Sequence, residues 1–145
     1  MFTKKIYPDF WNRYADSFAN GLPKLVQDTK FVVLDTETTG FDVREDRILS
    51  IGAIVLQRQM ILPKKAFEVF LEQDRYTEET AKIHGILKEG RKDRITEREA
   101  LKQTLKTLEN AVLVAHHTGY DVAMLNNALK RNGLPKLKNK TLDTA

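Results

Sequence analysis

The chain has 145 residues, enough for one domain with a sizeable core, and its composition is that of an ordinary globular protein. The 24 basic and 20 acidic residues give a net charge of +4, which permits nucleic-acid binding, although no long Lys or Arg run supports it. The chain has no cysteine, which excludes a disulfide framework and a thiolate zinc site. No apolar run approaches the roughly 18 residues that a membrane span needs, and the N-terminus lacks the apolar region of a signal peptide. We therefore expect a cytoplasmic protein that does not contact a membrane.

Residues 1–29 are predicted to form an N-terminal helical extension, separate from the domain that follows. Pro8 suits the first position of a helix, and Gly21 with Pro23 would end it. Four aromatic residues recur at helical spacing, namely Phe10, Trp11, Tyr14 and Phe18. Stacking on bases is one use for such a stripe, but packing is the commoner one. We expect this helix to dock on the domain or on a partner.

Residues 30–145 show the order of elements of an α/β domain. Strands are predicted at 31–35, 47–56, 66–71, 111–115 and, as a short fifth strand, near 141–143. Helices are predicted at 77–84, from the capping box of Thr96 and Glu99 onward, and at 119–132. Three strands in meander order followed by strands after helical crossovers predict a mixed sheet of about five strands, flanked by helices.

Two carboxylates stand together at the end of the first predicted strand. Asp35 and Glu37 follow the apolar run of residues 31–34, and their i, i+2 spacing places both side chains on one face of the strand. Hard oxygen ligands on a rigid strand suit Mg²⁺ or Mn²⁺. The simpler alternative is that both carboxylates only solvate the strand end.

A third carboxylate, Asp121, lies where the fourth predicted strand meets the next helix. The local sequence is His116-His117-Thr118-Gly119-Tyr120-Asp121, and an acidic residue is favoured in the first turn of a helix. Thr118 and Asp121 could therefore be only a helix cap with its partner. If the first and fourth strands are neighbours, however, Asp121 would converge with Asp35 and Glu37.

These segments resemble the first two motifs of the DnaQ-like 3′-5′ exonucleases, a branch of the DEDD nucleases. The match covers Asp35-Thr36-Glu37-Thr38-Thr39-Gly40 and the Tyr120-Asp121 pair. The resemblance implies a ribonuclease H-like fold over residues 30–145. It also implies two divalent cations, Mg²⁺ or Mn²⁺, held by Asp35, Glu37 and Asp121, and hydrolysis of phosphodiester bonds at a nucleic-acid 3′ end.

The resemblance further implies which residues contact the substrate. The backbone of Thr38, Thr39 and Gly40 would border the pocket for the terminal nucleotide, with Gly40 allowing a sharp turn close to the substrate. His84, in an Ile-His-Gly-Ile segment, would lie beside that nucleotide, although a His before Gly is more often a helix C-cap. His116 and His117 stand where the family has His-Asn, and a His in place of Asn would make a sugar or phosphate contact pH-dependent.

The family's third motif, a His followed by a fourth Asp, has no counterpart in this sequence, because Asp143 belongs by position to the fifth strand. We expect the C-terminal part of the domain to be missing and the 145-residue chain to be a shortened, weak or inactive version of an active enzyme. The form of the first motif favours DNA over RNA and a DNA polymerase subunit as partner. An RNA-trimming exoribonuclease and a non-catalytic nucleic-acid or polymerase-binding module of the same fold remain as alternatives.

Overall fold

The computed structural model describes residues 6–87 and 93–145. The elements along the chain are α1 (Asp9–Asp16), a 3₁₀ turn (Val26–Asp28), β1 (Lys30–Thr38), β2 (Ile48–Gln57), β3 (Met60–Phe70), α2 (Glu78–His84), α3 (Glu97–Leu108), β4 (Ala111–Ala115), α4 (Thr118–Arg131) and β5 (Thr141–Asp143). Within the described ranges, none of these helices is long and apolar enough to cross a membrane.

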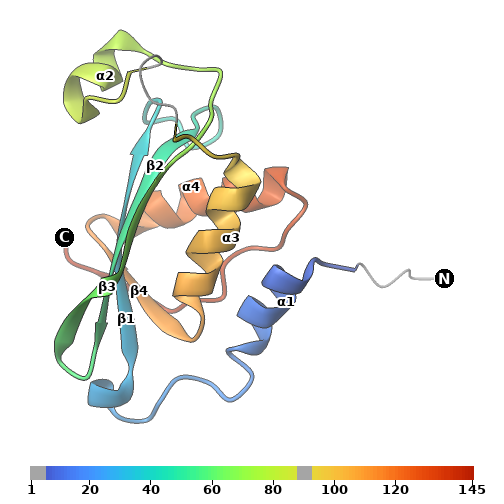
Figure 1. The fold of residues 1–145 in the computed structure, drawn as a ribbon, viewed down its shortest axis with the longest axis vertical. Helices are drawn as coiled ribbons and strands as arrows, with labels where there is room; N and C mark the ends of the chain where they lie inside the picture. The colour runs from blue at the N-terminus through green and yellow to red at the C-terminus, as the bar shows by residue number, and fades with distance from the viewer. Residues whose placement is uncertain (1–5, 88–92) are drawn as a thin grey trace.

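The five strands form one mixed sheet in the order β3-β2-β1-β4-β5 (Figure 1). β1 pairs antiparallel with β2 and parallel with β4, and β5 runs parallel to β4. The predicted mixed sheet of about five strands is confirmed. The expected neighbourhood of the first and fourth strands is confirmed as well, because Val33 of β1 is paired with Val114 of β4.

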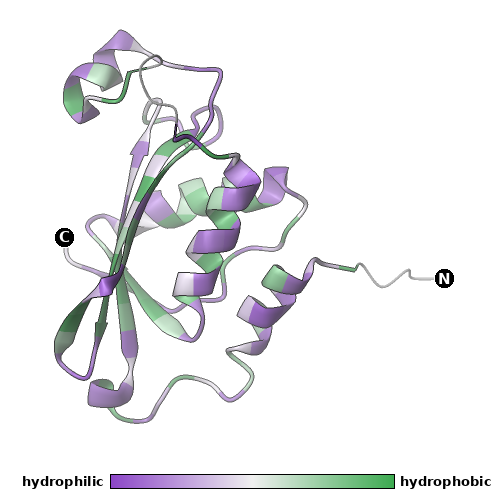
Figure 2. Cartoon of the chain, in the orientation of Figure 1, coloured by the Kyte–Doolittle hydropathy of each residue, from purple (hydrophilic) through white to green (hydrophobic). Residues whose placement is uncertain are grey.

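Three helices, α1, α3 and α4, lie on one side of the sheet, while α2 stands apart at its upper end (Figure 1). Side chains alternate along β1, so Val32 and Leu34 point into the core under the helices. Val33 points to the other face, where its side chain remains 39% exposed. Its partner on β2, Ile54, is 45% exposed. Figure 2 shows the strands as largely hydrophobic and the outward sides of α1 and α3 as hydrophilic.

The aromatic N-terminal helix packs on the domain, which was one of the two expectations. Trp11 and Tyr14 of α1 are almost fully buried and belong to the main core. The Tyr14 hydroxyl donates to Asn139 Oδ1 at 2.6 Å and accepts from the Lys138 amide at 2.7 Å. Burial raises the pKa of Tyr14 to about 12, so the hydroxyl remains a donor at neutral pH. The helix therefore fastens the segment that leads into β5.

Two predicted strand boundaries were wrong. β3 begins at Met60, whereas the prediction began at residue 66. The first half of the strand was not predicted because Pro63, Lys64 and Lys65 are typical of a loop. β3 is an edge strand, where proline and lysine are tolerated and discourage pairing with other chains. β1 continues beyond Asp35 to Thr38, since its polar residues still pair with β2 across the sheet.

Candidate active site

Asp35 and Glu37 project from the face of the sheet that α1, α3 and α4 leave open. Along β1 they alternate with Thr36, which is buried on the helix side. Their partners on β2 are Gly52 and Ser50, two small residues that leave room in front of the carboxylates. A shallow depression of about 500 Å³ beside Asp35 is lined by Gly52, Ile54, Glu68 and neighbouring residues.

Asp121, in the first turn of α4, is turned toward β1. Its Oδ1 accepts hydrogen bonds from the Thr36 amide at 3.1 Å and from Thr36 Oγ1 at 2.7 Å. The side chain is therefore fixed against the residue between Asp35 and Glu37. The alternative of a cap pairing Thr118 with Asp121 is wrong, because His117 is the N-cap of α4 and no side-chain cap bond forms there, while Thr118 Oγ1 donates to the carbonyls of Ala115 and Leu142.

Asp35 lies close enough to Glu37 and Asp121 for its charge to affect the pKa of both. Burial raises the pKa of Asp121, the hydrogen bonds from Thr36 lower it, and the negative charge of Asp35 raises it again. Burial also raises the pKa of Glu37, and the charges of Asp35 and Asp121 add to this increase, whereas His84 opposes it. The fold thus concentrates negative charge here, drawn from positions 35, 37 and 121.

The chemistry of these three residues fits a divalent cation of the Mg²⁺ or Mn²⁺ class. All three are carboxylates, which such ions prefer, and a cation would relieve the repulsion that raises the pKa values of Glu37 and Asp121. Within residues 6–87 and 93–145, no three His, Cys, Asp or Glu side chains already form a group able to hold a metal ion. Metal binding by these three carboxylates therefore stays a prediction.

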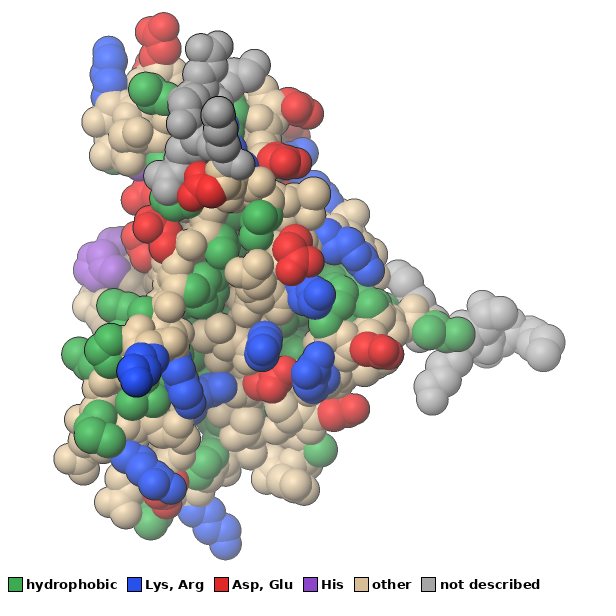
Figure 3. Space-filling model, in the orientation of Figure 1, with side chains coloured by type: hydrophobic (Ala, Val, Ile, Leu, Met, Phe, Trp, Pro, Cys, Tyr) green, Lys and Arg blue, Asp and Glu red, His purple; other side chains and the backbone are tan. Residues whose placement is uncertain are grey.

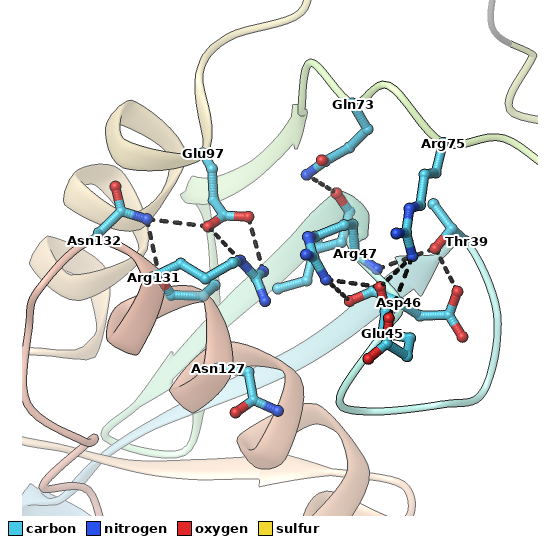
Figure 4. A network of polar contacts seen from close by, with 12 residues as sticks. Thr39, Glu45, Asp46, Arg47, Gln73, Arg75, Glu97, Asn127, Arg131 and Asn132 are labelled. Atoms are coloured by element: carbon cyan, nitrogen blue, oxygen red, sulfur yellow. Dashed lines mark hydrogen bonds and ion pairs between the residues drawn. The ribbon is translucent and has the colours of Figure 1, made fainter.

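The loop of residues 39–47, which follows the first motif, is held by a network that the sequence did not reveal (Figure 4). At its centre, Asp46 accepts from Thr39 Oγ1 at 2.7 Å and from the Asp42 amide at 2.8 Å. From α4, the Tyr120 hydroxyl donates to the Gly40 carbonyl at 2.8 Å, and Asn127 donates to the Val43 carbonyl at 2.7 Å. The sequence shows Asp46 as an acidic residue in a polar loop, which hinted at a structural role. Its hydrogen-bond partners could not be inferred from residue spacing.

Thr38, Thr39 and Gly40 sit inside this network. The side chains of Thr38 and Thr39 are buried, and Thr38 Oγ1 lies 2.7 Å from the Tyr120 hydroxyl. Gly40 is required by a close approach, because a Cβ there would lie 2.5 Å from Asp46 Oδ2. The neighbour of Gly40 in the structure is thus a carboxylate of its own loop, and contact of this backbone with substrate stays a prediction.

His84 ends α2 and lies on the side of Glu37, whose pKa its charge lowers. Its Nδ1 accepts from the Ile86 amide at 2.9 Å, and Gly85 adopts the left-handed conformation of a helix C-cap. Ile86 is buried in a small cluster with Leu49 and Phe70, which anchors the turn. His84 Nε2 is buried and has no hydrogen-bond partner among the described residues.

His116 and His117 are exposed at the junction of β4 and α4, with ring centroids 4.6 Å apart. His117 has a left-handed backbone at the N-cap of α4, and its amide donates to Asp143 Oδ1 at 3.0 Å. His116 Nδ1 lies 3.3 Å from Thr144 Oγ1. Both rings are thus associated with the end of β5, and contact with substrate stays a prediction for both.

The fold is that of solved exonuclease structures. Apo Exonuclease I superposes with a TM-score of 0.71 at 18% identity, covering 81% of this chain and 29% of that chain. The E. coli Exonuclease I complex with a dA16 oligonucleotide superposes with a TM-score of 0.71 at 18% identity, covering 80% of this chain and 28% of that chain. The predicted ribonuclease H-like α/β class is confirmed.

Residues 32–145 match the family described as exonuclease, and the chain belongs to this family. Among its relatives, the DNA polymerase III epsilon subunit of Treponema pallidum is 32% identical over 115 residues, covering 79% of this chain and 53% of that protein. The epsilon subunit of Rickettsia prowazekii is 34% identical over 119 residues, covering 78% and 52%. A PolC-type DNA polymerase III of Caldanaerobacter subterraneus subsp. tengcongensis is 35% identical over 116 residues, covering 79% of this chain and 8% of that protein.

The chain thus spans about half the length of the epsilon relatives and a small part of the PolC-type protein. The resemblance to DnaQ-like exonucleases is confirmed.

Proposed function

We propose that this chain carries the metal-binding and substrate-binding half of a 3′-5′ exonuclease site that acts on DNA and works beside a DNA polymerase. The observation that supports it most directly is the pair of hydrogen bonds that hold Asp121 against Thr36, between Asp35 and Glu37. Membership of the exonuclease family supports removal of nucleotides from a strand end, and relatives named as DNA polymerase III subunits support a polymerase as partner.

In this proposal Asp35, Glu37 and Asp121 hold two Mg²⁺ or Mn²⁺ ions. The ions would activate water and stabilise the leaving 3′ oxygen of the phosphodiester. Asp35 and Glu37 orient the site from a rigid strand, while Thr36 keeps Asp121 in place. Tyr120 fixes the Gly40 carbonyl at the border of the pocket, and His84, which ends α2 on the side of Glu37, would lie beside the terminal nucleotide.

The proposal includes slow turnover by the 145-residue chain. The family resemblance assigns the general base to a His of the third motif, which this sequence does not contain. Loss of a general base costs about 10² to 10⁴ in rate. A family member that carries the third motif is therefore expected to turn over faster than this chain by a factor of that order.

The test is digestion of a single-stranded DNA oligonucleotide, labelled at its 5′ end, by the 145-residue chain with Mg²⁺ or Mn²⁺. A ladder that shortens from the 3′ end is expected, and it should disappear in Asp35→Asn, Glu37→Gln and Asp121→Asn. Asp28→Asn, a change in the exposed 3₁₀ turn, is the control and should leave the ladder intact. Full activity in the three site variants would refute the metal role.

The same protein variants also test the two alternatives, a non-catalytic module and an exoribonuclease. Isothermal titration with Mn²⁺ distinguishes an enzyme from a non-catalytic module of the same fold, because a module has no need of cations at these carboxylates. An all-RNA oligonucleotide of the same sequence tests the exoribonuclease alternative, which depends on contacts to the 2′-hydroxyl. Faster digestion of RNA than of DNA would reverse the proposed substrate preference.

A further inference from the structure

A second pocket, of about 450 Å³, lies between α3 and the strands on the helix-covered side of the sheet. Its lining includes three lysines, Lys30 of β1, Lys65 of β3 and Lys106 of α3, and we call it the lysine pocket. Phe67 and Val55 contribute apolar surface, and Glu109 contributes one carboxylate. The volume falls within the range of about 300–1,000 Å³ that small-molecule sites occupy.

The lysine pocket is separate from the carboxylates of the candidate active site. Lys30 is the first residue of β1, whereas Asp35 and Glu37 lie near the other end of that strand. Lys30 shares its face of the strand with Val32 and Leu34, which point under the helices. The carboxylates point to the opposite face, so one small ligand cannot touch both places.

Positive charge dominates the lysine pocket. Burial lowers the pKa of Lys30, and the charge of Lys65 lowers it further, although Glu109 opposes both effects. Glu109 also faces Arg13, 4.0 Å away. In the described parts of the chain, no carboxylate lies within ion-pair distance of any of the three lysines. Figure 3 shows Lys and Arg side chains gathered on the face of the molecule over α3 and the adjoining strand.

We propose that the lysine pocket binds one nucleotide unit, with its phosphate among Lys30, Lys65 and Lys106. Ammonium groups bind phosphate as point charges, and an anion would relieve the mutual repulsion of the lysines. The ring of Phe67 offers a surface on which a base can stack. The carboxylate of Glu109 accepts hydrogen bonds from a sugar hydroxyl or a base amino group.

The same features disfavour an acidic peptide as occupant. Such a peptide would bring several carboxylates into a small pocket that already contains Glu109, and like charges at short range repel. A nucleotide carries a phosphate for the lysines and hydrogen-bond donors on its sugar and base for Glu109, and the pocket lining contains both kinds of group. This inference goes beyond the exonuclease function and does not depend on it.

The test is isothermal titration of the full chain with dAMP in buffer that contains EDTA, so that no cation contributes at the carboxylates. We expect Lys65→Gln and Lys106→Gln each to weaken dAMP binding by about tenfold, the value of one charged hydrogen bond. Lys64→Gln is the matched control, because this neighbour on the same exposed strand does not line the pocket. Phe67→Leu should weaken dAMP binding but not binding of inorganic phosphate.

Three results would overturn the proposal. They are absence of dAMP binding to the wild-type chain, equal loss in Lys64→Gln and Lys65→Gln, and binding of an acidic peptide in place of dAMP. An oligonucleotide that competes with dAMP would identify a strand as the source of the nucleotide, and one that does not would identify the free mononucleotide. Repeating the titration in Asp35→Asn separates this site from the proposed activity, since binding should persist there.

Discussion

The carboxylate of Asp121 is held where ionisation is costly, and this has a consequence for stability. Burial raises its pKa above the ordinary value of 3.8, so as pH rises the unfolded chain loses this proton before the folded chain does. The folded state therefore loses stability as pH rises from about 3.8 through the higher pKa of the folded state. The negative charge of Asp121 that suits cation binding destabilises the folded state when no cation is bound.

Replacing Asp121 by Asn should therefore stabilise the protein at neutral pH. The amide oxygen can still accept from Thr36 while the charge is gone, and we expect a gain of about 1 kcal/mol in the free energy of unfolding at pH 7. The gain should shrink as pH falls through 3.8 and disappear below it, where the carboxyl becomes protonated in both states. Urea denaturation with a chelator present measures both values, with Asp28→Asn as control. A gain of equal size at both pH values would contradict this account.

Tyr120 offers a second test at the scale of one residue, because its hydroxyl joins α4 to the loop that follows the first motif. Tyr120→Phe removes the bonds to Thr38 and Gly40, and we expect a loss of about 1 kcal/mol in stability. Amide hydrogen exchange in the loop of residues 39–47 should become faster. Tyr76→Phe is the matched control, since the Tyr76 hydroxyl has no hydrogen-bond partner among the described residues. Equal losses of stability in the two variants would show that the hydrogen bonds of the Tyr120 hydroxyl do not stabilise the loop.

At the scale of elements, the shape of the loop of residues 39–47 depends on Gly40 having no Cβ. Gly40→Ala would drive a methyl group into the carboxylate of Asp46, and we expect a cost of about 1–3 kcal/mol. In an Asp46→Ala background the same change should cost clearly less, because the clash is gone. Urea denaturation of the four proteins completes the double-mutant cycle. Additive costs would place the origin of the Gly40 requirement elsewhere.

The sequence predicted the elements that carry an apolar run or a cap, and it missed those that depend on packing between distant segments. β2 and β4 were predicted to within a residue or two, and Thr96 opens α3 as the capping box required. The first half of β3 was missed because proline and lysine resemble a loop until the strand is known to be an edge.

The candidate site shows the same limit. The convergence of Asp121 with β1 followed from strand order, because the carboxyl end of β4 delivers α4 beside β1. The bond to Thr36 did not follow, and neither did the role of Asp46, because both depend on side-chain directions across more than one element. Periodicity reports which face a residue occupies but not which polar atom it meets there.

At the scale of the whole molecule, α1 extends the core of the domain. It contacts α3, and Tyr14 reaches the segment before β5, so the first and last described parts of the chain are tied together. Glu97 of α3 adds a second tie, a two-bond ion pair with Arg131 of α4 at 2.9 and 3.1 Å (Figure 4). The helix layer therefore supports the strands that carry the carboxylates.

Trp11→Ala tests whether α1 is integral to the fold. Trp11 is 3% exposed, and truncating a buried Trp costs about 3–5 kcal/mol, a large part of the 5–15 kcal/mol typical of a domain. Because this is the one tryptophan in the chain, far-ultraviolet circular dichroism must replace fluorescence as the probe of urea denaturation. Asp16→Ala, exposed in the same helix, is the control and should change stability by no more than about 0.5 kcal/mol. If α1 were an independent extension, Trp11→Ala would leave the main transition of residues 30–145 where it is in the wild type, whereas we expect that transition to move to lower urea as a single step.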